Sequence, residues 1–203
     1  GVLAMMRVTY YLFGADFLRG SWAQYALTAL ALCTVFTGSM LALKEKVLKK
    51  RLAYSTVSQV SYVLFGMLLL SPGGMRGALL QMTFHALAKD ALFMAAGAII
   101  MASNFTTVDQ LVGIGKRMPK TMLAFSAAAL SIIGIPPMSG FISKWYLAAA
   151  ALNSESRLVG YLGVAMLILS ALMTAGYLLP IAVRGAGRLP GLDALFTATS
   201  AVC

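Results

Sequence analysis

The sequence predicts an all-α, polytopic membrane helix bundle, and three observations support this class. Hydrophobic residues make up 60% of the 203 residues, charged residues make up 11%, and the mean hydropathy is +0.86. A soluble domain has about 25% charged residues. The apolar residues form continuous runs, and the charged residues gather between these runs. Continuous rather than alternating apolar runs favour membrane helices over a β-barrel.

Six apolar segments are predicted as membrane spans, because a helix needs roughly 20 apolar residues to cross the hydrocarbon core. They cover residues 1–14, 22–43, 52–70, 77–102, 121–152 and 158–183. The first is expected to be the end of a helix. We expect a membrane domain at 1–184 and an atypical tail at 185–203 that begins a further apolar segment. Because both chain ends lie in apolar stretches, the sequence is expected to be a fragment.

The distribution of basic residues predicts the orientation of the spans. Loops 44–51, 103–120 and 184–192 carry ten Lys and Arg residues, whereas the loops that alternate with them carry at most four. Basic loops are retained in the cytoplasm, so we expect these three loops to be cytoplasmic. A re-entrant segment in place of a true span would change this alternation. The net charge of +10 is then a topology signal, and without a basic face interleaved with aromatic residues we expect no nucleic-acid binding.

Polar residues at the centre of the run 77–102 are the first candidate functional residues. Lys89 lies 12 residues from one end of this run and 13 from the other, too deep to reach the headgroups. A charge at this depth costs at least about 2.5 kcal/mol, so it must face other helices or water. Gln81, His85 and Lys89 share one helical stripe at i, i+4 and i+8. An imidazole titrates near neutral pH and can pass protons, which favours a proton relay over purely structural hydrogen bonding.

The segment 121–152 is predicted to be a broken helix. As one straight helix it would be about 48 Å long, which exceeds the hydrocarbon core. Pro136 and Pro137 remove two backbone donors, so we expect an interruption near 135–140. Broken membrane helices are common beside ion paths.

Lys144 follows this break directly, and its position leaves two interpretations open. If the second half of the helix folds back into the membrane region, Lys144 lies inside the protein and belongs to the relay. Alternatively it anchors the helix at the interface beside Trp145 and Tyr146, as aromatic belts do.

A second polar stripe runs along the segment that begins near Lys49. Ser55, then Ser58 or Gln59, and then Tyr62 fall along one helical face. Such a stripe lines a hydrated seam or simply bonds one helix to another. Lys49, at its mouth, is placed to load protons from the cytoplasm.

No residue pattern in the chain indicates covalent chemistry or a bound cofactor. Cys33 and Cys203 lie 170 positions apart, and with His85 as the single histidine no zinc or haem ligand set can be assembled. We therefore expect free thiols, no metal, no cofactor and no catalytic chemistry in this chain.

Several stretches resemble the antiporter-like membrane subunits shared by Mrp-type sodium/proton antiporters, respiratory complex I and membrane-bound hydrogenases. The matching stretches, in this order, are LKKRLAYSTVSQVSYVLFG (48–66), FHALAKDALFMAAGAI (84–99), IGKRMPKTMLAF (114–125), IPPMSGFISKWYL (135–147) and ALMTAGYLLPI (171–181). With the opening GVLAMMRVTYYLFG they cover nearly everything up to about residue 184.

The resemblance implies a fold of two inverted five-helix repeats, each with one broken helix and a buried proton-carrying axis. This chain then holds the end of the first repeat and the whole second repeat. Carried over by position, Lys49, His85, Lys89 and Lys144 match the family's proton-carrying residues. Gln81 stands where some members have a second histidine, and water is expected to fill that step. The first repeat's acidic and basic pair lies outside this chain.

The resemblance implies proton, or sodium and proton, translocation as one subunit of a hetero-oligomeric complex in the bacterial inner membrane. In a redox-driven complex the flavin, iron–sulfur and quinone sites would belong to partner subunits. Two alternatives stay open. The tail, DALFTATSAVC, resembles the segment before the first pore loop of Trk/Ktr-type potassium transporters, and a non-conducting structural membrane subunit is the other alternative.

The predicted orientation can be tested by cysteine labelling in intact cells. In a Cys33→Ser, Cys203→Ser background, Lys46→Cys should resist a membrane-impermeant maleimide until the cells are permeabilised. Arg76→Cys, in a loop predicted on the opposite side, should react without permeabilisation. Strong labelling at position 46 in intact cells would contradict the orientation.

Overall fold

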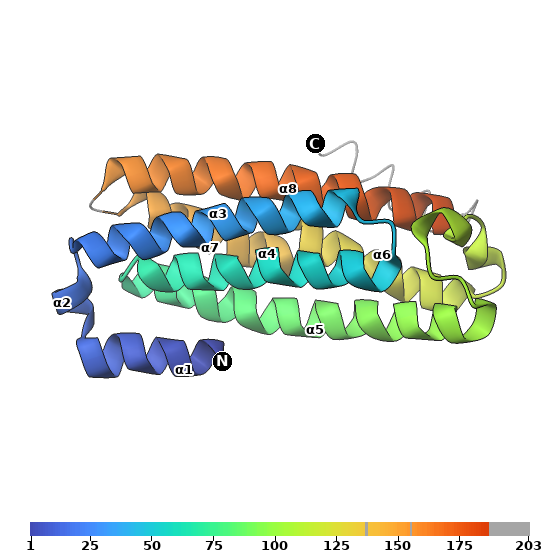
Figure 1. The fold of residues 1–203 in the computed structure, drawn as a ribbon, viewed down its shortest axis with the longest axis horizontal. Coiled ribbons are helices and arrows are strands. Elements are labelled where there is room, and N and C mark those ends of the chain that lie inside the picture. Colours follow the sequence, from blue (N-terminus) through green and yellow to red (C-terminus); the bar gives the residue numbers. More distant parts are fainter. Residues whose placement is uncertain (137, 155, 187–203) are drawn as a thin grey trace.

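A computed structural model describes residues 1–136, 138–154 and 156–186. Figure 1 shows an elongated bundle in which the long helices run roughly parallel to one axis. The helices are α1 (Val2–Arg7), α2 (Ala15–Leu18), α3 (Trp22–Lys44), α4 (Leu48–Leu68), α5 (Pro72–Ser103), α6 (Pro119–Ile133), α7 (Ser139–Leu152) and α8 (Arg157–Ala186), with π-helical η1 (Val8–Phe13) and 3-10 turns η2 (Val108–Leu111) and η3 (Ile114–Lys116). The predicted potassium-transporter-like tail lies outside the described residues.

The helices form a polytopic membrane bundle, as the composition predicts. By length and composition, α3, α5 and α8 are long and apolar enough to cross a membrane. The predicted span at 52–70 falls mostly within α4, and the predicted span at 121–152 is divided between α6 and α7. Large apolar side chains face outward: Leu30 is 61% exposed and Leu172 is 66% exposed. Such side chains suit contact with lipid.

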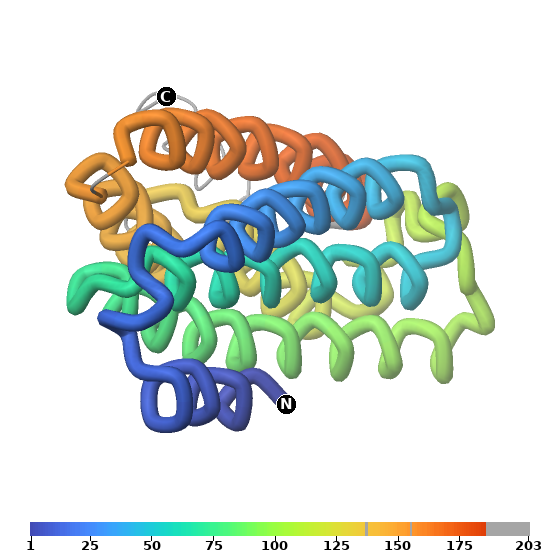
Figure 2. The backbone as a smooth tube through the Cα atoms, turned by 60° about the vertical axis from the view of Figure 1, so that its left-hand side comes forward, coloured from blue at the N-terminus to red at the C-terminus, as the bar shows by residue number. Residues whose placement is uncertain are grey.

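Helix α4 lies at the centre of the arrangement, between α3 and α5 (Figures 1 and 2). Helix α5 also packs against α6 and α7, and α8 packs against α3, α6 and α7. The short α1 packs against α4, buries Met6 in the core, and connects to α3 through η1 and α2 (Figure 2). The long helices therefore enclose α4 and one face of α5.

Local sequence signals set the ends of the longest helices. The Ser71 hydroxyl accepts a hydrogen bond from the Gly74 N–H at the start of α5, and Pro72 occupies the first turn, where its missing N–H is not needed. At the other end Asn104 takes the left-handed conformation, with φ of 57°. Asparagine tolerates this conformation better than most residues, so it can end a helix of 32 residues.

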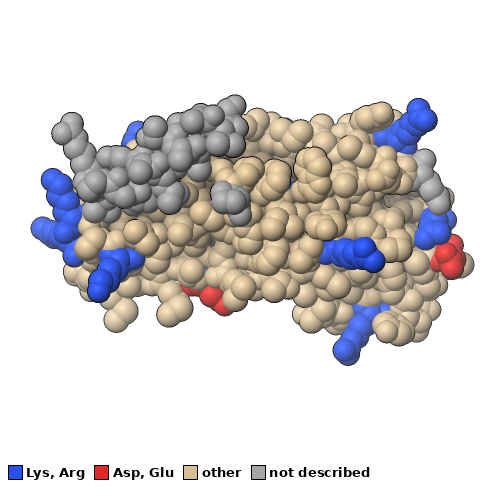
Figure 3. Space-filling view, turned by 180° about the vertical axis from the view of Figure 1, so that it is seen from behind, with Lys and Arg blue, Asp and Glu red and all other residues tan. Residues whose placement is uncertain are grey.

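Three basic loop segments meet at one end of the bundle. The Leu48 N–H donates to the Thr106 carbonyl, the Val108 N–H donates to the Lys46 carbonyl, and the Gly113 N–H donates to the Arg184 carbonyl. These bonds join segments from 44–51, 103–120 and the end of α8. In Figure 3 most basic side chains lie toward the two ends of the long axis, some are set in from one end, and the surface between is largely uncharged apart from an acidic patch near its lower edge. This surface pattern suits a protein that spans a bilayer.

The predicted break in segment 121–152 is present. Helix α6 ends at Ile133, Gly134 takes a left-handed φ of 88°, and α7 begins at Ser139. The break starts one residue earlier than the predicted 135–140. Gly140 lies in the first turn of α7. Its missing side chain lets that turn approach α6, since a Cβ there would collide with the Ser131 carbonyl oxygen.

Two apolar clusters make up the core, and a polar layer lies between them. One cluster includes Leu52, Leu92 and Phe125, and the other includes Tyr62 and Ala78. Along both α4 and α5, the residues between the two clusters are polar and buried: Ser55, Ser58, Gln59, Gln81 and His85. The candidate functional residues therefore occupy the middle of the bundle.

The close approach at Gly140 gives a stability prediction. Gly140→Ala should lower the melting temperature of the purified protein, because relieving the collision with Ser131 must move backbone, at a cost of about 1–3 kcal/mol. Gly97→Ala is the matched control, since a Cβ at Gly97 meets nothing within 4 Å. That substitution should be neutral or stabilising. Equal melting temperatures for the two variants would show that α6 and α7 do not meet this closely.

Candidate proton-relay site

The Lys89 ammonium is buried between α5 and α4, with a side chain that is 5% exposed. Its Nζ donates to the Leu52 carbonyl at 2.8 Å and to the Ser55 hydroxyl at 2.8 Å. The Phe93 ring lies 5.9 Å from the same atom. Lys89 is thus held by neutral oxygens, and within the described ranges it has no carboxylate partner.

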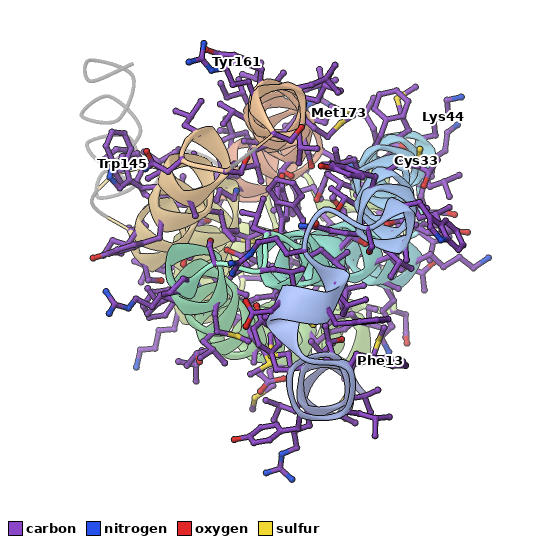
Figure 4. All side chains as sticks on the ribbon, turned by 90° about the vertical axis from the view of Figure 1, so that its left-hand side faces the viewer. Phe13, Cys33, Lys44, Trp145, Tyr161 and Met173 are labelled. Carbon is purple, nitrogen blue, oxygen red and sulfur yellow. The ribbon has the colours of Figure 1, made fainter. Side chains whose placement is uncertain are left out.

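Lys144 is partly buried at the broken helix. Its Nζ donates to the carbonyls of Ile132 at 2.8 Å and Ile133 at 2.6 Å. These carbonyls are available because the last four carbonyls of a helix have no partner within it, and this end carries the negative pole of the helix dipole. The next residue, Trp145, points outward from the bundle (Figure 4) and is 64% exposed. The structure therefore places Lys144 inward and supports the interior interpretation over an interfacial anchor.

His85 is the buried titratable group on which the charges of both lysines act. The imidazole is 9% exposed and interacts electrostatically with both Lys89 and Lys144. Its Nδ1 is buried and has no hydrogen-bond partner within the described residues. His85 and Ile132 line a small cavity of about 10 Å³. A cavity of this size holds about one water molecule.

Two buried amides and a hydroxyl connect α4, α5 and α7 beside this cavity. The Ser143 hydroxyl donates to Gln81 Oε1 at 2.6 Å, and Gln81 Nε2 donates to Gln59 Oε1 at 2.8 Å. The Gln59 Nε2 atom has no hydrogen-bond partner among the described residues. Both glutamines line the same cavity as His85, so a water there would meet unpaired Gln59 and His85 nitrogens.

The polar residues along α4 have two different sets of contacts. Ser55 binds Lys89, and the Tyr62 ring lies 5.7 Å from Lys144 Nζ. Helical spacing in the sequence left Ser58 and Gln59 as alternatives for this polar stripe. Gln59 faces the lysine site, whereas Ser58 faces α3 and α8. The Ser58 hydroxyl lies 2.8 Å from that of Ser39 on α3, which lies 2.6 Å from that of Ser170 on α8. Ser58 therefore links three helices and does not contact the lysines.

Lys49 is not brought into this buried set. It lies exposed in the first turn of α4, at the end of the bundle where the basic loops meet. Ser143 is a site residue that the sequence reasoning did not single out. The signal for it was its place next to Lys144, one turn after Gly140. No group of three or more His, Cys, Asp or Glu side chains in the described ranges is placed to hold a metal ion.

Comparison with known proteins identifies the family of this chain. The model for the transmembrane region of the NADH:quinone oxidoreductase/Mrp antiporter family matches residues 1–175. The chain belongs to this family. It is 42% identical to NADH-quinone oxidoreductase subunit N of Desulforudis audaxviator over 148 residues. The matched stretch covers 73% of this chain and 29% of that protein. Chain 4 of the NAD(P)H-quinone oxidoreductase of Picosynechococcus is 33% identical over 155 residues, or 75% of this chain and 29% of that protein.

Chains of two solved membrane complexes have a fold similar to that of this chain. A chain of the Mrp complex from Dietzia superposes with a TM-score of 0.75 at 30% identity, covering 87% of this chain and 32% of that one. A chain of the archaeal membrane-bound sulfane sulfur reductase superposes with a TM-score of 0.80 at 24% identity, covering 99% and 42%. The chain thus spans about a third of the length of these relatives.

The buried hydrogen bonds of Gln81 give a prediction about stability. Gln81→Leu should destabilise the purified protein by about 1–3 kcal/mol, because Ser143 and Gln59 Oε1 lose a buried partner. Thr83→Val is the control on the same helix, since Thr83 is exposed and bonds only its own helix backbone. Thermal unfolding in detergent measures both. A Gln81→Leu protein that unfolds at the same temperature as Thr83→Val would contradict the buried network.

Proposed function

We propose that this chain is the proton-carrying part of a membrane subunit, with Lys89, His85 and Lys144 as the relay. The observation that carries this proposal is the pair of lysines that are held by neutral oxygens and whose charges both act on one buried histidine. Intramembrane ionisable residues are costly and mark ion pathways and proton relays. Family membership supports the same interpretation, because subunits of quinone oxidoreductases and an Mrp complex are among its relatives.

The surroundings of Lys89 accommodate both of its protonation states. A protonated amine donates to the Leu52 carbonyl and to Ser55, as found here. A neutral amine keeps an N–H for the Leu52 carbonyl and offers its lone pair to the Ser55 O–H, which rotates to donate. Since no carboxylate is paired with Lys89 in the described chain, no ion pair has to break when the proton leaves.

The relay then passes through the imidazole. His85 lies one helical turn from Lys89, a rise of about 6 Å. It can accept a proton at one ring nitrogen and release another from the other nitrogen. A water in the adjoining cavity would connect His85 to the wall formed by Ser131 and Ile132, where Lys144 is bound. Each transfer moves one proton and leaves the donor ready to be reloaded.

Lys49 keeps a separate place in this proposal. Its exposed position near the basic loops suits an entry or surface role rather than membership of the buried relay. Other membrane subunits of a hetero-oligomeric complex are the proposed partners, and protons, with sodium as a second candidate ion, are the proposed cargo. The bacterial inner membrane is the proposed location.

Transport measurements on Lys89 variants test the proposal. In the full complex reconstituted into vesicles, Lys89→Ala should reduce proton uptake to background, at least tenfold, while the complex still assembles. Lys89→Arg should fail as well, because a guanidinium does not release its proton in this pH range. His85→Ala should be milder, because water can occupy the vacated space. Lys46→Ala, which removes an exposed loop lysine, is the control and should transport normally.

Assembly is checked for every variant by native gel electrophoresis. Full proton uptake in assembled Lys89→Ala would remove this residue from the relay and favour a structural subunit. Repeating the assay with and without sodium shows which ion the complex moves.

A further inference from the structure

The outward face of α5 carries an acidic residue at membrane depth. Thr83, Leu87, Asp90 and Met94 lie at successive helical turns and are all exposed, and Met101, two turns further on, is exposed as well. This stripe, which we name the α5 outer face, lies away from the stripe that buries Gln81, His85 and Lys89. Apart from Asp90, the α5 outer face is apolar or carries a hydroxyl that bonds its own helix.

The depth of Asp90 makes contact with lipid costly. It lies 18 residues from Pro72 and 13 from Ser103, which corresponds to about 27 Å and about 20 Å along the helix. The hydrocarbon core is about 30 Å thick, so the carboxylate falls near its centre. One methylene group cannot carry the carboxylate to the headgroups. A charged aspartate at this depth is costly unless it is paired, and such residues almost always face a bundle interior, a water-filled cavity or a partner of opposite charge.

No residue of the described chain relieves this cost. Asp90 has no ion pair or side-chain hydrogen bond within the described residues, and the neighbouring Lys89 points inward to Leu52 and Ser55. The outward faces of α3 and α8 differ, since the sequence of α3 has no charge before Lys44 and that of α8 has none between Arg157 and Arg184. Those faces suit lipid, whereas the α5 outer face requires a partner for Asp90.

We propose that the α5 outer face is the contact surface for a membrane helix of a neighbouring subunit that carries a Lys or Arg at the depth of Asp90. Charge complementarity identifies the partner's chemistry, because a basic side chain at that depth has the same need for a partner. Leu87 and Met94, 67% and 76% exposed, flank Asp90 by about one turn on each side and provide apolar contact area. Methionine adapts its shape to an irregular neighbouring surface. This inference rests on the proposed multi-subunit assembly.

Photo-crosslinking in cells that express the full complex tests the surface. A benzophenone amino acid at Met94 should crosslink to a single other membrane subunit, and mass spectrometry should place the crosslink within about one turn of a Lys or Arg. The same probe at Leu172, an exposed position of α8, is the matched control and should give lipid adducts only. Lipid adducts alone at Met94, a crosslink to a second copy of this chain, or a partner helix without a basic residue would each overturn the proposal.

Charge variants test the role of Asp90 itself. Asp90→Lys should reduce recovery of the subunit in the complex at least tenfold, and replacing the crosslinked partner's basic residue with Asp should restore it. Asp90→Leu is more apolar and serves if the lysine variant fails to fold; it should also weaken assembly. Asp109→Lys, at an exposed position of η2, is the charge-matched control. Undiminished assembly of Asp90→Leu would overturn the proposal.

These outcomes are scored by crosslinking and assembly without any transport assay. A wild-type complex that assembles and gives the expected crosslink but does not transport protons would therefore count against the proposed relay. It would still support the proposed contact surface on α5. A wild-type complex that transports protons but gives no crosslink would count against the α5 contact surface and leave the proposed relay standing.

Discussion

Inside a bilayer every backbone carbonyl needs a partner, and the break between α6 and α7 is the place where this chain must meet that need with a side chain. Ending α6 at Ile133 leaves carbonyls without helical partners, and Lys144 returns from α7 to bind two of them. The carbonyls in turn stabilise an ammonium that would otherwise be costly to bury. The broken helix and the inward lysine therefore depend on each other, and Gly140 permits both by letting α7 begin close to α6.

Buried polar groups in the middle of the bundle likewise satisfy one another by hydrogen bonding. Lys89 is satisfied by the Leu52 carbonyl and Ser55, and Gln81 by Gln59 and Ser143, so the polar layer ties α4, α5 and α7 together. The serines at positions 39, 58 and 170 join α3, α4 and α8 on the other side. Three buried side-chain atoms have no hydrogen-bond partner among the described residues: Gln59 Nε2 and His85 Nδ1, whose residues line the small cavity, and Ser126 Oγ on α6. Two of these three atoms therefore lie where a proton would need a water to cross.

Much of this arrangement could be predicted from the sequence, because membrane spans and helix breakers leave strong local signals. The apolar runs predicted the helices, the Gly and Pro residues predicted the break, and the depth of Lys89 in its run predicted its burial. Partner choice was less predictable. Helical spacing alone left Ser58 and Gln59 as alternatives, since the choice depends on how α4 is rotated against α3 and α5. The carbonyls of Leu52, Ile132 and Ile133 escaped the sequence reasoning because backbone acceptors carry no sequence signal. Ser143 was missed although it stands next to Lys144 and one turn after Gly140.

The most direct test of the central claim is proton uptake by vesicles that contain the complex with Lys144→Arg. Arginine keeps the positive charge and can still donate to the Ile132 and Ile133 carbonyls, so the helix break should persist, but it does not release its proton. If Lys144 carries protons, the assembled variant should show uptake at the background level. Wild-type uptake by assembled Lys144→Arg would show that this residue only caps the broken helix, and would contradict a relay that runs through it.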